Sequence, residues 1–70
     1  MKVTKINSGI YTIKGRQTTY SIMHQPDTRT WNIYEVIVED GIERNLPIET
    51  CDSKKECVEL IEHWEKRMEK

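Results

Sequence analysis

The C-terminal segment constrains the fold most, because it carries the pattern of a single amphipathic helix. Ser53 and Glu56 have the spacing of a capping box. In this motif the serine hydroxyl accepts a hydrogen bond from the backbone N–H of the glutamate, and the glutamate side chain accepts one from the backbone N–H of the serine. Apolar residues then recur at helical spacing on one side; they are Cys57, Leu60, Ile61, Trp64 and Met68. We therefore predict a helix over about residues 54–69 that covers a core.

The chain before this helix is rich in β-branched and aromatic residues that alternate with turn signals. Pro26 with Asp27 marks one turn, and Asp40 with Gly41 marks a hairpin. The runs between turn signals predict strands over residues 10–14, 18–24, 31–38 and 42–48, with a shorter candidate over 3–6. We predict an α+β fold, an antiparallel sheet of three to four strands with one C-terminal helix packed across one face.

The length of the chain limits what else it contains. A chain of 70 residues buries only about 60% of the surface that its unfolded form exposes, so we expect one domain over 1–70. The sheet region should span about 3–49. No apolar run approaches the roughly 18 residues of a membrane span, and no export signal is visible, which favours a cytoplasmic protein with reduced thiols and no membrane partner.

The loop length of the second hairpin decides which side chains face the helix. A two-residue loop at Asp40-Gly41 pairs Ile37 with Arg44 and mixes charged with apolar side chains. A three-residue loop that includes Glu39 pairs Val38 with Ile42, so we choose the three-residue register. The core face is then Tyr20, Ile22, Tyr34, Val36, Val38, Ile42, Leu46 and Ile48.

This register leaves a group of large apolar residues on the face away from the helix. Trp31, Ile33 and Ile37 would lie together there, beside Glu35 and Glu43. A contiguous exposed apolar group is a candidate contact surface. The alternative is that the first ten residues fold over Trp31 and make it part of the core.

Charge is distributed unevenly along the chain. Residues 1–34 carry five basic residues against one acidic residue, and residues 35–52 carry six acidic residues against one basic residue. Residues 53–70 carry five of each. A uniform attraction to nucleic acid or membrane needs a field of one sign, which this chain lacks.

The residues that most often carry chemistry do not form a known catalytic or metal-binding pattern. Cys51, Cys57, His24 and His63 lack the spacing of zinc ligands, so we expect no metal and no cofactor. A disulfide between Cys51 and Cys57 is conceivable across the helix start, although a reducing compartment argues against it. The acidic residues near Asp40 belong to an exposed hairpin tip, where a carboxyl keeps its ordinary acidity. We therefore expect no enzyme activity and no small-molecule substrate.

Nucleic-acid binding is the alternative function. Trp31, with Tyr11 or His24 nearby, could stack on bases, while Lys14, Arg16 and Arg29 could contact phosphates. A three-stranded antiparallel sheet backed by one helix also resembles the architecture of plant AP2 and phage integrase arm-binding domains. That resemblance implies that the sheet face reads DNA, although it concerns architecture alone.

Protein binding accounts for the same residues without the repulsion that Glu35 and Glu43 on this face would exert on the phosphates of a nucleic acid. An apolar centre ringed by charges of both signs has the anatomy of an interface with an anchor and a polar rim. We therefore predict a non-enzymatic binding or regulatory protein that docks a protein partner, or a second copy as a homodimer, through the uncovered sheet face. The predicted contact residues are Trp31, Ile33, Ile37, Arg29, Arg16, Glu35 and Glu43.

Overall fold

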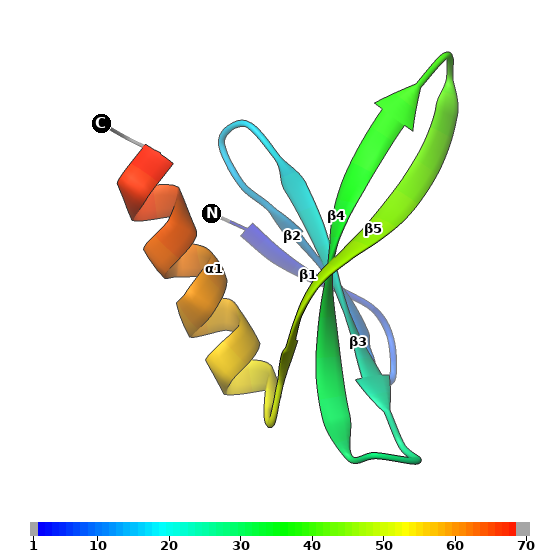
Figure 1. Cartoon of the computed structure of the whole chain (residues 1–70), viewed down its shortest axis with the longest axis vertical. Helices are drawn as coiled ribbons and strands as arrows, with labels where there is room; N and C mark the ends of the chain where they lie inside the picture. The colour runs from blue at the N-terminus through cyan, green and yellow to red at the C-terminus, as the bar shows by residue number, and fades with distance from the viewer. Residues whose placement is uncertain (1, 69–70) are drawn as a thin grey trace.

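Five strands followed by one helix make up the computed structural model, which describes residues 2–68 apart from the side chain of Met68 (Figure 1). The strands join into one antiparallel sheet in sequential order. The elements are β1 (Lys2–Asn7), β2 (Ile10–Lys14), β3 (Thr19–Gln25), β4 (Thr30–Glu39), β5 (Ile42–Cys51) and α1 (Lys54–Met68). The α+β class is as predicted, but the sheet has five strands, because β1 pairs with β2 over its whole length. The predicted helix end at residue 69 lies outside the described residues.

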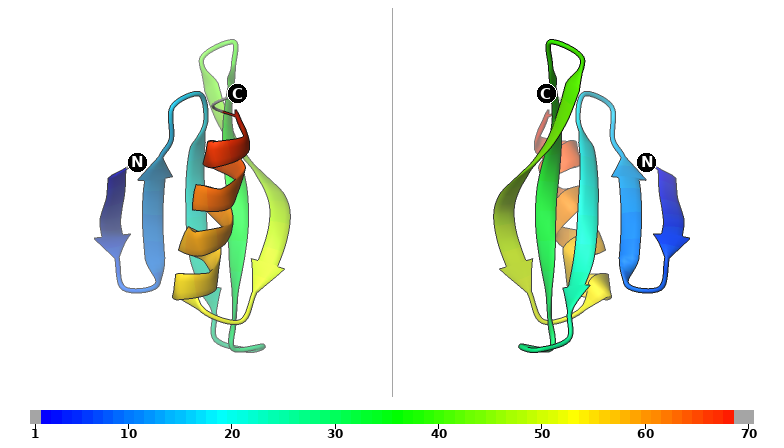
Figure 2. Two further views of the ribbon diagram at one scale, coloured as in Figure 1. Left: turned by 90° about the vertical axis from the view of Figure 1, so that its left-hand side faces the viewer. Right: turned by 90° about the vertical axis from the view of Figure 1, so that its right-hand side faces the viewer.

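The start of α1 confirms the serine half of the capping box expected from the sequence. The hydroxyl of Ser53 accepts a hydrogen bond of 3.1 Å from the backbone N–H of Glu56. This bond satisfies one of the donors that the first turn leaves unpaired. The predicted apolar stripe faces the sheet, with Cys57 and Ile61 fully buried. The helix therefore covers one face of the sheet, while no helix or strand of residues 2–68 lies over the other face (Figure 2).

The second hairpin has a two-residue loop, so the predicted three-residue register is wrong. Asp40 and Gly41 both have positive φ, 53° and 78°, and Glu39 pairs with Ile42. Positive φ at both positions is the requirement of a type I′ turn, whose twist matches that of the flanking strands. Asp-Gly favours this turn strongly. The preference of Asp40-Gly41 for this turn therefore sets the register of the hairpin. Charged side chains can pair with apolar ones here because the end of the hairpin is exposed to solvent.

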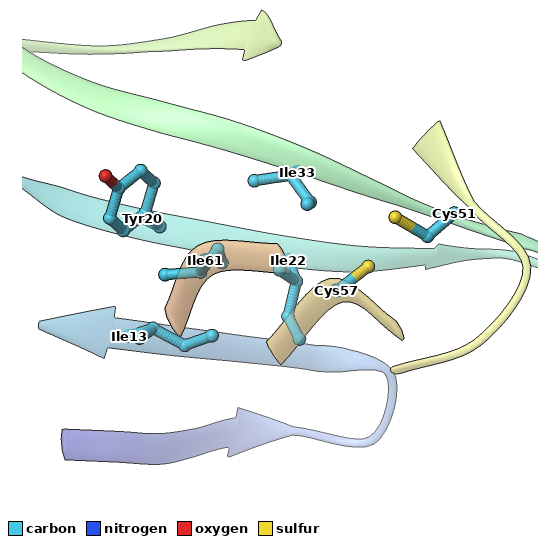
Figure 3. Close-up of a cluster of buried hydrophobic side chains, with 7 residues drawn as sticks. All are labelled: Ile13, Tyr20, Ile22, Ile33, Cys51, Cys57 and Ile61. Carbon is cyan, nitrogen blue, oxygen red and sulfur yellow. The ribbon is translucent and has the colours of Figure 1, made fainter. Parts of the chain in front are cut away.

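The observed pairing also reassigns the two faces. Ile22 pairs with Ile33, and Tyr20 pairs with Glu35. Paired side chains lie on the same face, so the odd-numbered residues of β4 face the helix. The predicted core residues Tyr34, Val36 and Val38 lie on the other face, and that prediction is wrong. The predicted core residues Ile42, Leu46 and Ile48 do lie on the helix side, but they are exposed, so their predicted burial is also wrong. The buried core consists of Ile13, Tyr20, Ile22, Ile33, Cys51, Cys57 and Ile61 (Figure 3).

The helix covers its face only in part. Helix α1 contacts β3, β4 and β5, while the turn end of the β4–β5 hairpin extends past it and leans away (Figures 1 and 2). We call residues 35–46 the hairpin arm. β5 is an edge strand, which explains why it accepts Pro47. A bulge opposite Ile33 and Tyr34 adds Ile48 to the helix side.

Candidate functional site

The three apolar residues predicted to anchor a partner on the uncovered face lie on the helix side instead. Ile33 is fully buried in the core, and Trp31 is half-buried and packs against it. Ile37 is half-buried beside Leu46 in the hairpin arm. The cause is the register of β4, which places these side chains on the face of Tyr20 and Ile22. The first residues do not cover Trp31, because residues 2–7 form the edge strand β1.

The four charged residues predicted around that anchor are not brought together. Arg29 lies in the β3–β4 turn with a positive φ of 57°, and Arg16 lies in the turn at the opposite end of β3. Glu35 is half-buried on the helix side, whereas Glu43 pairs with Val38 and is exposed on the other side. The predicted set therefore does not form one surface.

One end of the uncovered face is polar, and its side chains pair with one another. The Thr50 hydroxyl donates to the side-chain oxygen of Asn32 at 3.0 Å, and the Asn32 amide donates to the Tyr34 hydroxyl at 3.4 Å. A hollow of about 500 Å³ at one end of this face has polar walls; they are Gln25, Asp27, Thr28, Thr30, Asn32 and Thr50. The walls of this hollow lack the apolar centre that marks most protein interfaces. Farther along the same face, β4 presents Tyr34, Val36 and Val38, of which Val38 is 65% exposed.

Exposed apolar side chains gather on the β4–β5 hairpin instead. Ile42 is 65% exposed, Leu46 48% and Ile48 39%. Pairing with Glu39 and Glu35 places Ile42 and Leu46 on the helix side, where Ile37 also lies. We call Ile37, Ile42, Leu46 and Ile48 the arm strip. Arg44 lies between Ile42 and Leu46 on the same face and pairs with Glu39, so the strip alternates exposed apolar and charged side chains. Its exposed apolar groups make it a candidate contact surface in the described part of the molecule.

The arm strip runs into a hollow of about 370 Å³ between α1 and the sheet. We call this space, whose lining is Tyr20, Glu35, Ile48, Trp64 and Arg67, the aromatic hollow. The rings of Tyr20 and Trp64 form its floor, with centroids 6.1 Å apart and planes tilted by 39°. Glu35 and Arg67 add one charge of each sign. Aromatic walls with a few polar groups at the rim are typical of a pocket that receives an apolar side chain.

A buried carboxylate beside this hollow was not predicted. Glu65 is 9% exposed, and its Oε1 accepts a hydrogen bond of 2.7 Å from the backbone N–H of Arg16. Its Oε2 is buried without a hydrogen-bond partner. Glu65 follows Ile61 by four positions, so it lies on the inner side of α1. Its spacing from Ile61 is the only feature of the sequence that indicates the burial of Glu65. Because charged residues usually lie on the surface, this spacing was not interpreted as a sign of burial.

Three rings form a second cluster at the start of α1. The ring centroid of Trp31 lies 6.1 Å from that of Tyr11 and 4.9 Å from that of His24. The ammonium of Lys54 lies 4.0 Å above the Tyr11 ring, a cation–π geometry. We call Tyr11, His24 and Trp31 the aromatic ledge. The structure thus brings together the three rings considered for base stacking, while Lys14 and Arg16 lie at the other end of β2.

The two thiols are buried and poorly suited to nucleophilic chemistry. Burial, together with the neighbouring Cys51 and the charge of Glu56, raises the pKa of Cys57 to about 12. Burial also raises the pKa of Cys51. The thiolate is the reactive form of cysteine, so both residues act as small apolar core residues near neutral pH. This confirms the sequence-based interpretation of Cys57.

Folding should become less favourable as the pH rises above about 9. The buried Cys57 keeps its proton up to a pKa of about 12, whereas an unfolded thiol loses it near about 8.5. Burial and the charges of Glu65 and Glu35 also raise the pKa of Tyr20. The unfolded state therefore binds fewer protons in this range, and its population grows.

Urea unfolding in reducing buffer at about pH 8 and about pH 10 measures this effect. We expect a lower midpoint at the higher pH, and a smaller difference for Cys57→Ala. An unchanged or higher midpoint at the alkaline pH would contradict the burial of these groups.

Three further observations complete the description of residues 2–68. Within that range, no cluster of three or more His, Cys, Asp or Glu side chains could hold a metal ion. No helix in the same range is long and apolar enough to cross a membrane. Comparison of the chain with protein-family models, with curated proteins and with solved structures finds no match.

Proposed function

We propose that this chain is a non-enzymatic binding protein that docks a protein partner through the arm strip and the aromatic hollow. One observation carries the proposal: exposed apolar side chains on the hairpin arm are continuous with an aromatic hollow. Burying such a strip gains about 25 cal/mol per Å² of apolar surface. Both thiols, the strongest nucleophiles of the chain, are buried, which supports a binding role over a catalytic one.

The charges around the surface support the same interpretation. Glu39 and Arg44 form an exposed ion pair of 2.7 Å within the strip, where Arg44 lies between Ile42 and Leu46. Glu35 and Arg67 line the hollow. Charges of both signs among exposed apolar groups fix the orientation of a partner with complementary charges. The surface proposed here differs from the one predicted from the sequence, but the proposed class of function, protein binding, is the same.

A random-peptide library selected on the immobilised folded chain tests this function. We expect enrichment of peptides with large apolar anchors, whose affinity falls about tenfold or more in Leu46→Asp. Val38→Asp is the matched control, because Val38 is as exposed as Ile42 but lies on the other side of the same hairpin. Failure to enrich such peptides, or equal losses in both variants, would reject the arm strip as a docking surface.

The aromatic ledge supports nucleic-acid binding as a second candidate. Lys54 lies over Tyr11, and Lys5 pairs with Tyr11 and so shares its face. Stacking on an aromatic ring contributes about 1–3 kcal/mol per base. Quenching of tryptophan emission by a short single-stranded oligonucleotide, weakened by salt and by Lys54→Glu, would favour this candidate. Emission that does not respond at low salt would exclude it.

A further inference from the structure

The two cysteines of the chain lie together where the sheet meets the helix. Cys51 is the last residue of β5, and Cys57 lies in the first turn of α1. We propose that they form a redox site, at which a low-molecular-weight disulfide such as oxidised glutathione converts the two thiols into one intramolecular disulfide bond. The aromatic hollow involves Trp64 and Arg67 near the other end of α1, so this inference goes beyond the proposed function and does not rest on it.

Strand pairing and side-chain contacts bring the two sulfur atoms together. Cys51 pairs with Trp31 across the β4–β5 ladder, and the Cys57 thiol donates a weak hydrogen bond of 4.0 Å to the backbone carbonyl of the same Trp31. Both side chains belong to the buried core, and Figure 3 shows their sulfur atoms pointing toward one another. The two thiols also share a side-chain hydrogen bond. Joining them therefore requires little movement of β5 or α1.

The surroundings of the pair make Cys51 the more acidic thiol. Burial raises the pKa of both cysteines. The hydrogen bond between them then raises the pKa of Cys57, which reaches about 12, and lowers that of Cys51. Cys51 therefore loses its proton first, while Cys57 keeps a proton to donate to it. Cys51 is also 9% exposed, whereas Cys57 is fully buried. Both differences make Cys51 the attacking residue, because the thiolate is the nucleophile.

The disulfide forms by two exchange steps. The Cys51 thiolate attacks one sulfur of oxidised glutathione, so that a mixed disulfide forms and one glutathione thiolate leaves. Cys57 gives up its proton to that thiolate and attacks the Cys51 sulfur, and the second glutathione thiolate leaves. The two cysteines lose two electrons and two protons in total. One molecule of oxidised glutathione takes them up and becomes two molecules of reduced glutathione.

The fold favours the internal disulfide over the mixed disulfide as the product. Holding the two sulfurs side by side raises the effective concentration of one thiol at the other. A glutathione adduct has no space in the tightly packed core around Cys57. Burial makes the first step slow, because the loop at Asp52 and Ser53 has to open before Cys51 can react. It does not change the equilibrium between the reduced and the oxidised chain.

Equilibration of the full chain in buffers with graded ratios of oxidised to reduced glutathione tests the proposal. Alkylation after denaturation and mass spectrometry separate the reduced chain with two adducts, the mixed disulfide and the internal disulfide with none. We expect the equilibrium constant for the internal disulfide to be about tenfold or more larger in native buffer than in concentrated urea. Samples that start reduced, and samples first oxidised in urea and refolded, should reach the same ratio.

The single-cysteine variants are matched controls for the order of the steps. Cys57→Ala, which leaves Cys51, should stop at the mixed disulfide and should react several times faster than Cys51→Ala. A faster reaction of Cys51→Ala would overturn Cys51 as the attacking residue. An equilibrium constant in native buffer that is equal to or lower than that in urea would overturn the redox site, and so would accumulation of the mixed disulfide in the unaltered chain.

Discussion

Replacing Ile33 by alanine should lower the free energy of unfolding by about 2–5 kcal/mol. Ile33 on β4 is fully buried between the sheet and α1, in the cluster that contains Ile22 and Ile61 (Figure 3). Removing its side-chain atoms leaves a cavity that a tightly packed core does not close. A domain of this size has a total stability of a few kcal/mol, so this single change should leave much of the protein unfolded at room temperature.

Urea or thermal unfolding followed by circular dichroism measures this loss. Val38→Ala is the control, because Val38 belongs to the same strand and is 65% exposed; its effect should stay within about 0.5 kcal/mol. A variant at Ile33 that folds normally and loses only binding would instead support the sequence-based interpretation of Ile33 as a surface residue.

Replacing Gly15 by alanine should cost about 1–3 kcal/mol of stability. A β-carbon at this position would lie 2.6 Å from the carboxyl carbon of Glu65. Because Glu65 is buried, its carboxylate cannot move aside without losing the hydrogen bond from the Arg16 backbone. The turn between β2 and β3 therefore needs glycine because the Glu65 carboxylate packs against it. A positive φ is not the reason.

A double-mutant cycle isolates this contact. In the background of Glu65→Ala the added methyl group has space, so Gly15→Ala should then cost less than about 0.5 kcal/mol. Unfolding free energies of the four proteins give the coupling. Equal costs of Gly15→Ala in both backgrounds would show that Glu65 does not pack on the turn as described.

The helix was predictable because its signals are local. The Ser53–Glu56 cap and the spacing of Cys57 and Ile61 depend only on residues within a few turns of one another, and the structure confirms both. Strand positions were also close to those predicted. The short strand predicted over residues 3–6 is the longer strand β1 in the structure, because it pairs with β2 across a tight turn.

The faces of the sheet were not predictable by matching apolar residues across a hairpin. That criterion assumes that the paired side chains are buried, whereas the hairpin arm lies beyond the helix and is exposed. Asp40 and Gly41 carried the correct signal, since Asp-Gly specifies a two-residue loop. The same error moved Trp31 and Ile33 to the wrong face. Ile42 and Leu46 were predicted on the correct face but as core residues, and they are exposed because the helix does not cover the hairpin arm.

The exposure of methyl groups to a soluble paramagnetic agent tests the central claim most directly, in a sample dilute enough to be monomeric. The claim is that α1 covers Ile33 and Ile61 and leaves Ile42 and Leu46 on the hairpin arm in solvent. The account predicts strong broadening of the Ile42 and Leu46 methyl signals and protection of those of Ile33 and Ile61. Protection of Leu46 together with broadening of Ile33 would contradict it.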